Sequence, residues 1–298
     1  MNWALAHRIA SMAAVQAHRD LGVDRTQYVH MHRALKAAGV IGMAQPMPRL
    51  FGVYFSPADK GPAVLLNASL NVITQRHTAA HELGHHRLGH RTAADEEIDP
   101  ALRWGNGSWP EEEKTAEAFA AWFLMPLPAV RAALGRICGS RPSTPEHVYR
   151  LARELGTSYA GTVRHLVNLR LLDSSRASQW VKLPPAGLRA ALAGGTALPA
   201  QAHVHVITGA SDGQTVYADA GDLLMLHLDG AVFDVLPKGL ELRDSNGVSP
   251  LMAAVVTAEL EPTAHHLVEV GVHGQSRPLR LTVEREAPRA GVDEVWPD

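Results

Sequence analysis

The sequence has a single cysteine, almost no net charge and no long hydrophobic run. Because Cys138 is alone, no internal disulfide can form, and cysteine usage gives no sign of secretion. A formal net charge of −2 provides no overall attraction to nucleic acid or to a membrane surface. No apolar stretch approaches the roughly 18 residues of a membrane span, and residues 1–8 lack the features of a signal peptide. We therefore expect a cytoplasmic protein without membrane association.

The N-terminal part of the chain mixes helical and strand-like patterns. At 298 residues the whole chain is long enough for two or three modules, each with its own core. Helical periodicity without glycine or proline predicts helices at 4–20 and 25–38. Short β-like segments with proline and glycine between them follow over 39–68, and another helix begins near Ser69. We expect an α+β domain over residues 1–140.

A pair of short helices is predicted next. Residues 143–146 have the form of a capping box and begin a helix at 148–155. A turn at 156–158 separates it from a second helix at 159–172. Helix, short turn and helix are typical of a helix-turn-helix, so we interpret residues 141–175 as a helix-turn-helix-like segment.

The last third of the chain differs from the rest in composition and in hydrophobic pattern. Residues 176–200 are rich in serine, proline and glycine, which indicates a linker containing one short helix. After residue 201 the hydrophobic pattern has a period of two and is interrupted by turn pairs. This pattern predicts a C-terminal all-β domain over 201–298, a sandwich or barrel. We interpret it as a sensor or substrate-docking module; the alternative is a module that only stabilises the protein. The turn pairs are Asp212-Gly213, Asp229-Gly230, Asn246-Gly247 and His273-Gly274.

Residues 81–85 contain the chemically informative motif, H-E-x-x-H, inside the helix that begins near Ser69. Residues four apart on a helix lie on one face, separated by about 6 Å along the axis, so His81 and His85 can bind one metal ion. Zinc lowers the pKa of a bound water from about 15.7 to about 7. Glu82 lies one residue further round and can accept that proton as a general base. The motif thus predicts metal-dependent peptide hydrolysis.

The motif alone is not decisive, because the sequence contains 17 histidines and such a pattern also arises by chance. A catalytic zinc usually has three protein ligands and one open position, so a third ligand is needed. A metzincin-type continuation would require glycine and histidine where the chain has Leu88 and Arg91. The next predicted helix, which begins around Trp109, offers three consecutive glutamates instead.

The choice among these glutamates is only partly determined by the pattern. The apolar stripe of the helix turns Glu111 away from the core, whereas Glu112 and Glu113 flank the stripe about equally. Glu113 is followed one turn later by Glu117, a second carboxylate that could accept a hydrogen bond from a ligand histidine. The alternative is that all three glutamates only complement the positive end of the helix dipole.

The two motifs together resemble the ImmA/IrrE family of bacterial zinc peptidases. The matching segments are AVLLN (63–67), QRHTAAHELGH (75–85) and EKTAEAFAA (113–121), the last leading to Leu124-Met125-Pro126. The family's pattern E-x-E-A-N-x-F-A-A-x-L-L-M-P implies that Glu113 is the third metal ligand. Three departures from the family matter: Glu117 stands where asparagine is usual, Thr115 where a second glutamate is common and His77, in the preceding segment, where phenylalanine is usual.

The resemblance implies a zincin-like fold and a specific activity. Family members cleave a helix-turn-helix repressor and so switch on stress-response or mobile-element genes. We therefore expect a zinc-dependent endopeptidase, with manganese as a substitute metal, whose ligands are His81, His85 and Glu113 and whose base is Glu82. Its expected partner is a helix-turn-helix repressor that serves as substrate.

Two other functions remain open at this point. One is a DNA-binding transcription regulator whose zinc fold is only structural. Against it, a structural zinc site has four protein ligands and no use for a base such as Glu82. Residues 144–172 also have only a mild excess of arginine, so we do not expect direct DNA binding. The other is a general cytoplasmic oligopeptidase without a dedicated partner.

The remaining histidine pairs are interpreted as surface features. His86 and His90 are four residues apart and could bind a second metal ion, but we expect them to form a solvated helix face behind the motif. His203 and His205 alternate along one strand and share a face, which predicts a solvent-facing pair.

Overall fold

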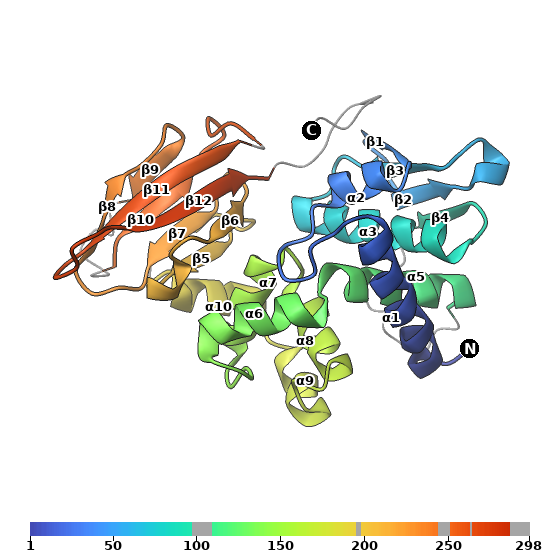
Figure 1. The fold of residues 1–298 in the computed structure, drawn as a ribbon, viewed down its shortest axis with the longest axis horizontal. Helices are drawn as coiled ribbons and strands as arrows, with labels where there is room; N and C mark the ends of the chain where they lie inside the picture. Colours follow the sequence, from blue (N-terminus) through green and yellow to red (C-terminus); the bar gives the residue numbers. More distant parts are fainter. Residues whose placement is uncertain (97–108, 195–197, 244–250, 263, 287–298) are drawn as a thin grey trace. The chain divides into compact units, whose positions relative to one another are not determined.

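The computed structural model describes residues 1–96, 109–194, 198–243, 251–262 and 264–286 (Figure 1). It divides into two compact units. The first contains Met1–Val130 and the second contains the described residues from Arg131 onward, so the division falls inside helix α6 (Leu127–Cys138). The presence of helices together with sheets that mix parallel and antiparallel strand pairs confirms the α+β class. The finer domain boundaries stay predictions.

The first unit follows the predicted order of helices and strands. The second predicted helix, 25–38, is shorter than expected because the Asp24 carboxylate accepts the backbone N–H of Thr26 at 2.8 Å and holds a turn there. In chain order the elements are α1 (Trp3–Asp20), α2 (Met31–Ala37), β1 (Ile41–Gln45), β2 (Leu50–Phe55), the 3₁₀ helix η1 (Pro57–Asp59), β3 (Ala63–Asn67), α3 (Val72–Leu88), β4 (Ala93–Glu96) and α5 (Glu111–Leu124).

Helix α3, which contains the H-E-x-x-H motif, has a well-defined start and end. The side chain of Asn71 accepts the backbone N–H of Thr74 at 3.0 Å and caps the first turn. Gly89 ends the helix in the left-handed conformation with φ 70°, where a side chain would be strained. These caps fix the length of α3 and therefore the positions of its histidines.

Helix α3 is enclosed by the sheet and by α5. The sheet has the strand order β1-β3-β2-β4, in which β1 is parallel to β3 and β2 is antiparallel to both neighbours. Helix α3 packs against β2 and β3 and also against α5, and α1 packs against α5 (Figure 1). Buried on α1 is a row of alanines whose small side chains allow close helix packing: Ala6, Ala10, Ala14 and Ala17. The motif helix is thereby held in the middle of the unit.

The second unit contains a group of helices followed by two sheets. Its elements are the main part of α6, then α7 (Pro145–Glu154), α8 (Tyr159–Asn168), α9 (Ser174–Trp180), α10 (Pro185–Leu192), β5 (Val204–Ile207), the 3₁₀ helix η2 (Gly209–Ser211), β6 (Thr215–Ala218), β7 (Leu223–Leu226), β8 (Ala231–Val235), β9 (Leu240–Arg243), β10 (Ala253–Val256), β11 (His265–Val272) and β12 (Leu279–Arg285). The expected turn at Asn246-Gly247 lies outside the described residues.

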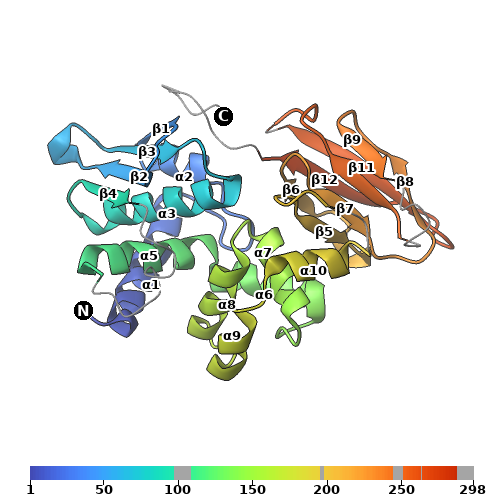
Figure 2. The ribbon, with the colours of Figure 1, turned by 180° about the vertical axis from the view of Figure 1, so that it is seen from behind.

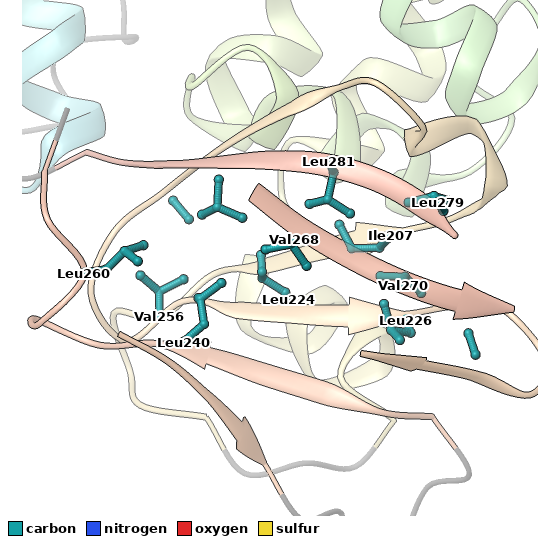
Figure 3. Packing of buried hydrophobic residues seen from close by; sticks show 13 residues of the cluster. Ile207, Leu224, Leu226, Leu240, Val256, Leu260, Val268, Val270, Leu279 and Leu281 are labelled. Atoms are coloured by element: carbon teal, nitrogen blue, oxygen red, sulfur yellow. The ribbon is translucent and has the colours of Figure 1, made fainter. Parts of the chain in front are cut away.

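The eight strands form two four-stranded sheets with the orders β5-β7-β10-β9 and β6-β12-β11-β8. Aliphatic side chains from both sheets make one core, including Leu224 and Leu226 of one sheet and Val268 and Leu281 of the other (Figure 3). All four residues of β7 are buried, so this strand is covered on both faces. The expectation of a separable C-terminal β domain stays a prediction.

The helices of the second unit pack against the start of its first sheet. Residues 176–200, expected to be a linker with one short helix, contain the end of α9 and all of α10. Buried Leu188 and Leu192 hold α10, which contacts α7 and β5 (Figure 2). The Tyr149 hydroxyl of α7 accepts the backbone N–H of Val204 in β5 at 3.0 Å. Helices α7 and α8 contact each other across a short connection, and their interpretation as a helix-turn-helix stays a prediction.

The expected solvent-facing pair on β5 is wrong for His205, which is buried. Its Nε2 lies 3.0 Å from the carboxylate of Asp222, the residue immediately before the neighbouring strand β7. The parallel pairing of β5 and β7 brings the two residues together, and a strand pattern alone does not show which face a neighbouring element covers.

Among the described residues, no single helix has the length and apolar character needed to cross a bilayer. Helices α5 and α6 meet those criteria only when they are joined across the bend between them.

Candidate metal centre

The three motif residues of α3 are all buried. His81 and His85 are each 1 % exposed and Glu82 is 0 % exposed. Helical spacing puts the two imidazoles on the same side, and their Nε2 atoms lie 3.1 Å apart. The Nε2 atoms of both rings therefore converge on one position.

Glu113 reaches this point from α5 because α3 and α5 pack unusually closely. A Cβ atom at Gly84 would lie 3.1 Å from Cα of Ala116 and equally near the ring of Phe119, so only glycine fits without a shift. The crossing places the Glu113 carboxylate next to both histidines. Its Oε2 is 3.1 Å from His81 Nε2, and its Oε1 is 3.5 Å from His85 Nε2.

The arrangement of these atoms suits a metal ion. A tetrahedral zinc with bonds of about 2.0–2.2 Å has ligand atoms about 3.3–3.6 Å apart, close to the spacings of the three groups. Two imidazole nitrogens and one carboxylate are also a donor set typical of catalytic zinc. Within the described ranges, His81, His85 and Glu113 are the group whose ligand atoms converge closely enough to hold a metal ion. Glu112, the alternative from the sequence, is exposed.

Charge and burial at the centre also favour a cation. Burial acts to raise the pKa of Glu113, but hydrogen bonds and charge interactions with His81 and His85 outweigh it, and the pKa lies well below its usual value. Burial lowers the pKa of His85 more than Glu113 raises it. The site therefore offers an ionised carboxylate and a neutral imidazole at neutral pH, which are the protonation states that metal binding requires.

Strand β2 covers the face of α3 that carries Glu82 and His85. A Cβ atom at Gly52 would lie 2.8 Å from Glu82 Oε1 and 2.5 Å from Cγ2 of Thr78, so the glycine lets the strand approach the glutamate. Tyr54, two residues on, stacks its ring on His85 with centroids 6.3 Å apart, and its hydroxyl is 3.1 Å from Nδ1 of His86. The strand thus restricts the space around both residues.

This part of the chain matches a known family. Residues 48–165 match the family model of M78 peptidases, described as the IrrE N-terminal-like domain. The matched range includes α3, α5 and the strands β2 and β3, and so it includes all four residues of the candidate centre. The chain carries an IrrE N-terminal-like domain. No curated protein matches the chain.

The match confirms the resemblance to the ImmA/IrrE family and identifies the IrrE N-terminal-like domain as a metallopeptidase domain. The structure brings together the residues predicted from the sequence, His81, His85 and Glu113, and places Glu82 beside them. Their individual roles as ligands and base stay predictions.

Within the IrrE N-terminal-like domain, the Nδ1 atoms of the two histidines predicted as ligands have different neighbours. His81 Nδ1 lies 3.4 Å from the Glu117 carboxylate on α5. His85 Nδ1 lies 3.0 Å from Nδ1 of His90, whose Nε2 is 3.5 Å from the Thr115 hydroxyl. Such partners fix the orientation of a metal-binding imidazole. The carboxylate partner was expected from the spacing of Glu113 and Glu117, whereas the imidazole partner was not.

The expected solvated face of His86 and His90 is therefore wrong. His86 contacts Tyr54, and His90 folds back against His85 because Gly89 ends the helix. The backbone N–H of His90 then donates to the carbonyl of His85 at 3.0 Å. Burial is the largest cause that lowers the pKa of His90, and the charge of the nearby His85 is the next. Together they lower this pKa to about 4, so the His90 ring is neutral at neutral pH. Helical spacing could not predict a residue that lies beyond the helix end.

Proposed function

We propose that the chain is a zinc-dependent endopeptidase that cleaves a helix-turn-helix transcriptional repressor and thereby derepresses stress-response or mobile-element genes. The observation that carries the proposal is the convergence of His81, His85 and Glu113 beside the buried Glu82. Three ligands and an adjacent carboxylate suit a hydrolytic site better than a closed structural one.

The residues have distinct roles in the proposed reaction. His81, His85 and Glu113 would hold the zinc, and manganese could replace it in the same donor set. The metal would lower the pKa of a bound water and polarise the scissile carbonyl. Glu82 takes the proton from the attacking water on its carboxylate and passes it to the leaving amine as the peptide C–N bond breaks. The close cover of Gly52 limits bulk water around that carboxylate.

An extended peptide suits the surroundings of the site. Strand β4 pairs with β2 and is an edge of the described sheet. Asp95 of β4 pairs with Gly52, which lies over Glu82, and Ala93 pairs with Tyr54, which lies over His85. A peptide that adds to this edge as a further strand would lie alongside the catalytic residues. This geometry supports a polypeptide substrate.

The repressor as substrate is supported by the family resemblance and is tested by co-expression. We expect a helix-turn-helix repressor encoded beside this chain to be cut at one position, and Glu82→Gln to abolish the cut while about one zinc per chain is retained. The variant should lose about 10²–10⁴-fold in rate, the usual contribution of a positioned general base. Cleavage by Glu82→Gln at the parent rate would refute the mechanism.

The same experiment separates the two alternatives. Cleavage of unrelated unfolded peptides at similar rates would favour a general oligopeptidase. Tight, sequence-specific DNA binding by a chain that does not cleave would favour a transcription regulator. Against the latter, α8 contains one arginine, Arg164, and one histidine, His165, and the histidine is buried. A recognition helix needs several polar side chains that reach base edges.

A further inference from the structure

Helix α3 carries a third histidine, His77, one turn before His81. Its Nε2 lies 2.9 Å from Oε2 of Glu117 on α5, and its side chain is 34 % exposed. The Glu117 side chain is only 6 % exposed. His77 therefore stands at the edge of the metal centre and reaches a buried carboxylate.

The same carboxylate oxygen faces His81. Oε2 of Glu117 is 3.4 Å from His81 Nδ1, while Nε2 of that ring is 3.1 Å from Glu113. His77 and His81 are four residues apart on α3, and Glu113 and Glu117 are four residues apart on α5. The two helices therefore present matching pairs, joined in the order Glu113, His81, Glu117 and His77.

A buried carboxylate needs hydrogen-bond donors, because leaving it without them costs the desolvation of the charge. The contact from His77 to Oε2, at 2.9 Å, is shorter than that from His81, at 3.4 Å, so His77 is the closer of the two imidazoles to this oxygen. His77 can donate from Nε2 either as the neutral tautomer or as the protonated ring. The contact therefore does not depend on the charge of His77.

We propose that His77 is a positioning residue of the metal centre: it holds Glu117, and Glu117 orients His81 so that Nε2 points at the metal position. The proposal rests on the metalloprotease function proposed above and deepens it. His77 and Glu117 are both positions at which the sequence departs from the family pattern, and the structure places the two departures on either side of one hydrogen bond. His85 has the separate partner His90 and should be unaffected.

The test measures zinc affinity of the full chain by competition with a chelator. Loss of the group that orients a metal-binding imidazole from outside typically lowers metal affinity about 10–100-fold, and we expect this for Glu117→Leu. His77→Leu should lower affinity by the smaller end of that range, about 10-fold, because it acts through Glu117. His77→Gln, which keeps an N–H donor, should remain within a few-fold of the parent. His273→Leu, at an exposed histidine, controls for adventitious zinc and should leave affinity unchanged.

The double variant distinguishes positioning from a general structural effect. If His77 acts through Glu117, adding His77→Leu to Glu117→Leu should lower affinity no further, because coupled residues are not additive. Equal losses in both backgrounds, or parent affinity in a folded His77→Leu protein, would overturn the proposal. Glu117→Ala, which also removes the acceptor, replaces Glu117→Leu in the cycle if the latter does not fold, as judged by circular dichroism of the metal-free protein.

A spectroscopic measurement adds a readout that stability alone would not change. Cobalt(II) bound at the centre should show altered visible absorption bands in His77→Leu and parent-like bands in His77→Gln. Failure of the parent to bind zinc, or cleavage by Glu82→Gln, would overturn the proposed function itself. A parent that binds zinc and a Glu82→Gln variant that does not cleave, together with an unchanged His77→Leu, would overturn only the role of His77.

Discussion

The interface between α3 and α5 and the core between the two C-terminal sheets are both buried, yet their chemistry is opposite. The first contains imidazoles and carboxylates, among them His81, Glu82 and Glu117. The second consists of aliphatic side chains from both sheets. Buried ionisable groups lower stability unless each finds a partner or a metal, whereas aliphatic groups stabilise a fold simply by leaving water. The difference indicates that the side chains of the helix interface suit metal binding, whereas those of the sheet core suit stability.

The largest expected effect separates two adjacent glutamates of α5. Glu113→Gln should reduce zinc affinity by at least about 100-fold, since even outer partners of a metal site contribute about 10–100-fold. Glu112→Gln, at the exposed neighbour, should leave zinc affinity unchanged. Isothermal titration with zinc checks both variants. A loss in Glu112→Gln with none in Glu113→Gln would reverse the assignment of the third ligand.

The next effect concerns the sheet core. Leu224→Ala should lower the local free energy of unfolding by about 2–5 kcal/mol, because it leaves a cavity in a packed aliphatic core. Zinc affinity should not change, since Leu224 belongs to the second unit and the candidate metal centre to the first. Hydrogen exchange of peptides from β7 and β11 measures the first quantity and chelator competition the second. Reduced zinc affinity in Leu224→Ala would show that the two regions are coupled.

A smaller effect tests a buried charge outside the metal centre. Burial acts to raise the pKa of Asp222, but the hydrogen bond and charge of His205 outweigh it and lower the pKa to about 2. A lowered pKa stabilises the folded state above the unfolded value of about 3.9. Above pH 4, the free energy of unfolding of the parent should exceed that of Asp222→Asn by on the order of 1–2 kcal/mol. This difference should disappear as the pH falls toward 2. Hydrogen exchange across β5 at several pH values measures this stability difference. A difference that does not change with pH would contradict the prediction.

The smallest effect compares two helical glycines. Gly84→Ala should separate α3 from α5 by a few tenths of an ångström and weaken zinc binding several-fold, because its Cβ would press on Ala116. Gly135→Ala, where no atom lies within 4 Å of the added Cβ, should instead stabilise its helix by about 0.5–1 kcal/mol. Zinc titration and thermal unfolding measure the two outcomes. Unchanged zinc affinity in Gly84→Ala would mean that the close crossing does not determine the ligand positions.

The part of the candidate site that lies on one helix was predictable. His81, Glu82 and His85 belong to a single helix, and helical geometry fixes their relative positions whatever surrounds them. The element order before residue 90 was predictable for the same reason, since hydrophobic periodicity and caps are local signals. The second predicted helix was too long because a local turn at Asp24 competed with it.

The contributions of neighbouring elements were not predictable from these signals. Gly52 and Tyr54 read as ordinary strand residues, and only the packing of β2 on α3 brings them to Glu82 and His85. A glycine within a strand can mark the close approach of another group, which was the available hint. His205 was expected at the surface because its strand pattern does not reveal the neighbour Asp222.

The sequence by itself determined which side chains share one helix, namely two imidazoles and a glutamate, together with the α+β class and the alternating C-terminal pattern. The tertiary structure decided which first-turn glutamate faces the histidines, which side chains support them and which strand covers them. The physical reason is the range of the interactions. Spacing within a helix follows from backbone geometry, whereas the choice of Glu113 over Glu112 depends on how closely α5 crosses α3 at Gly84.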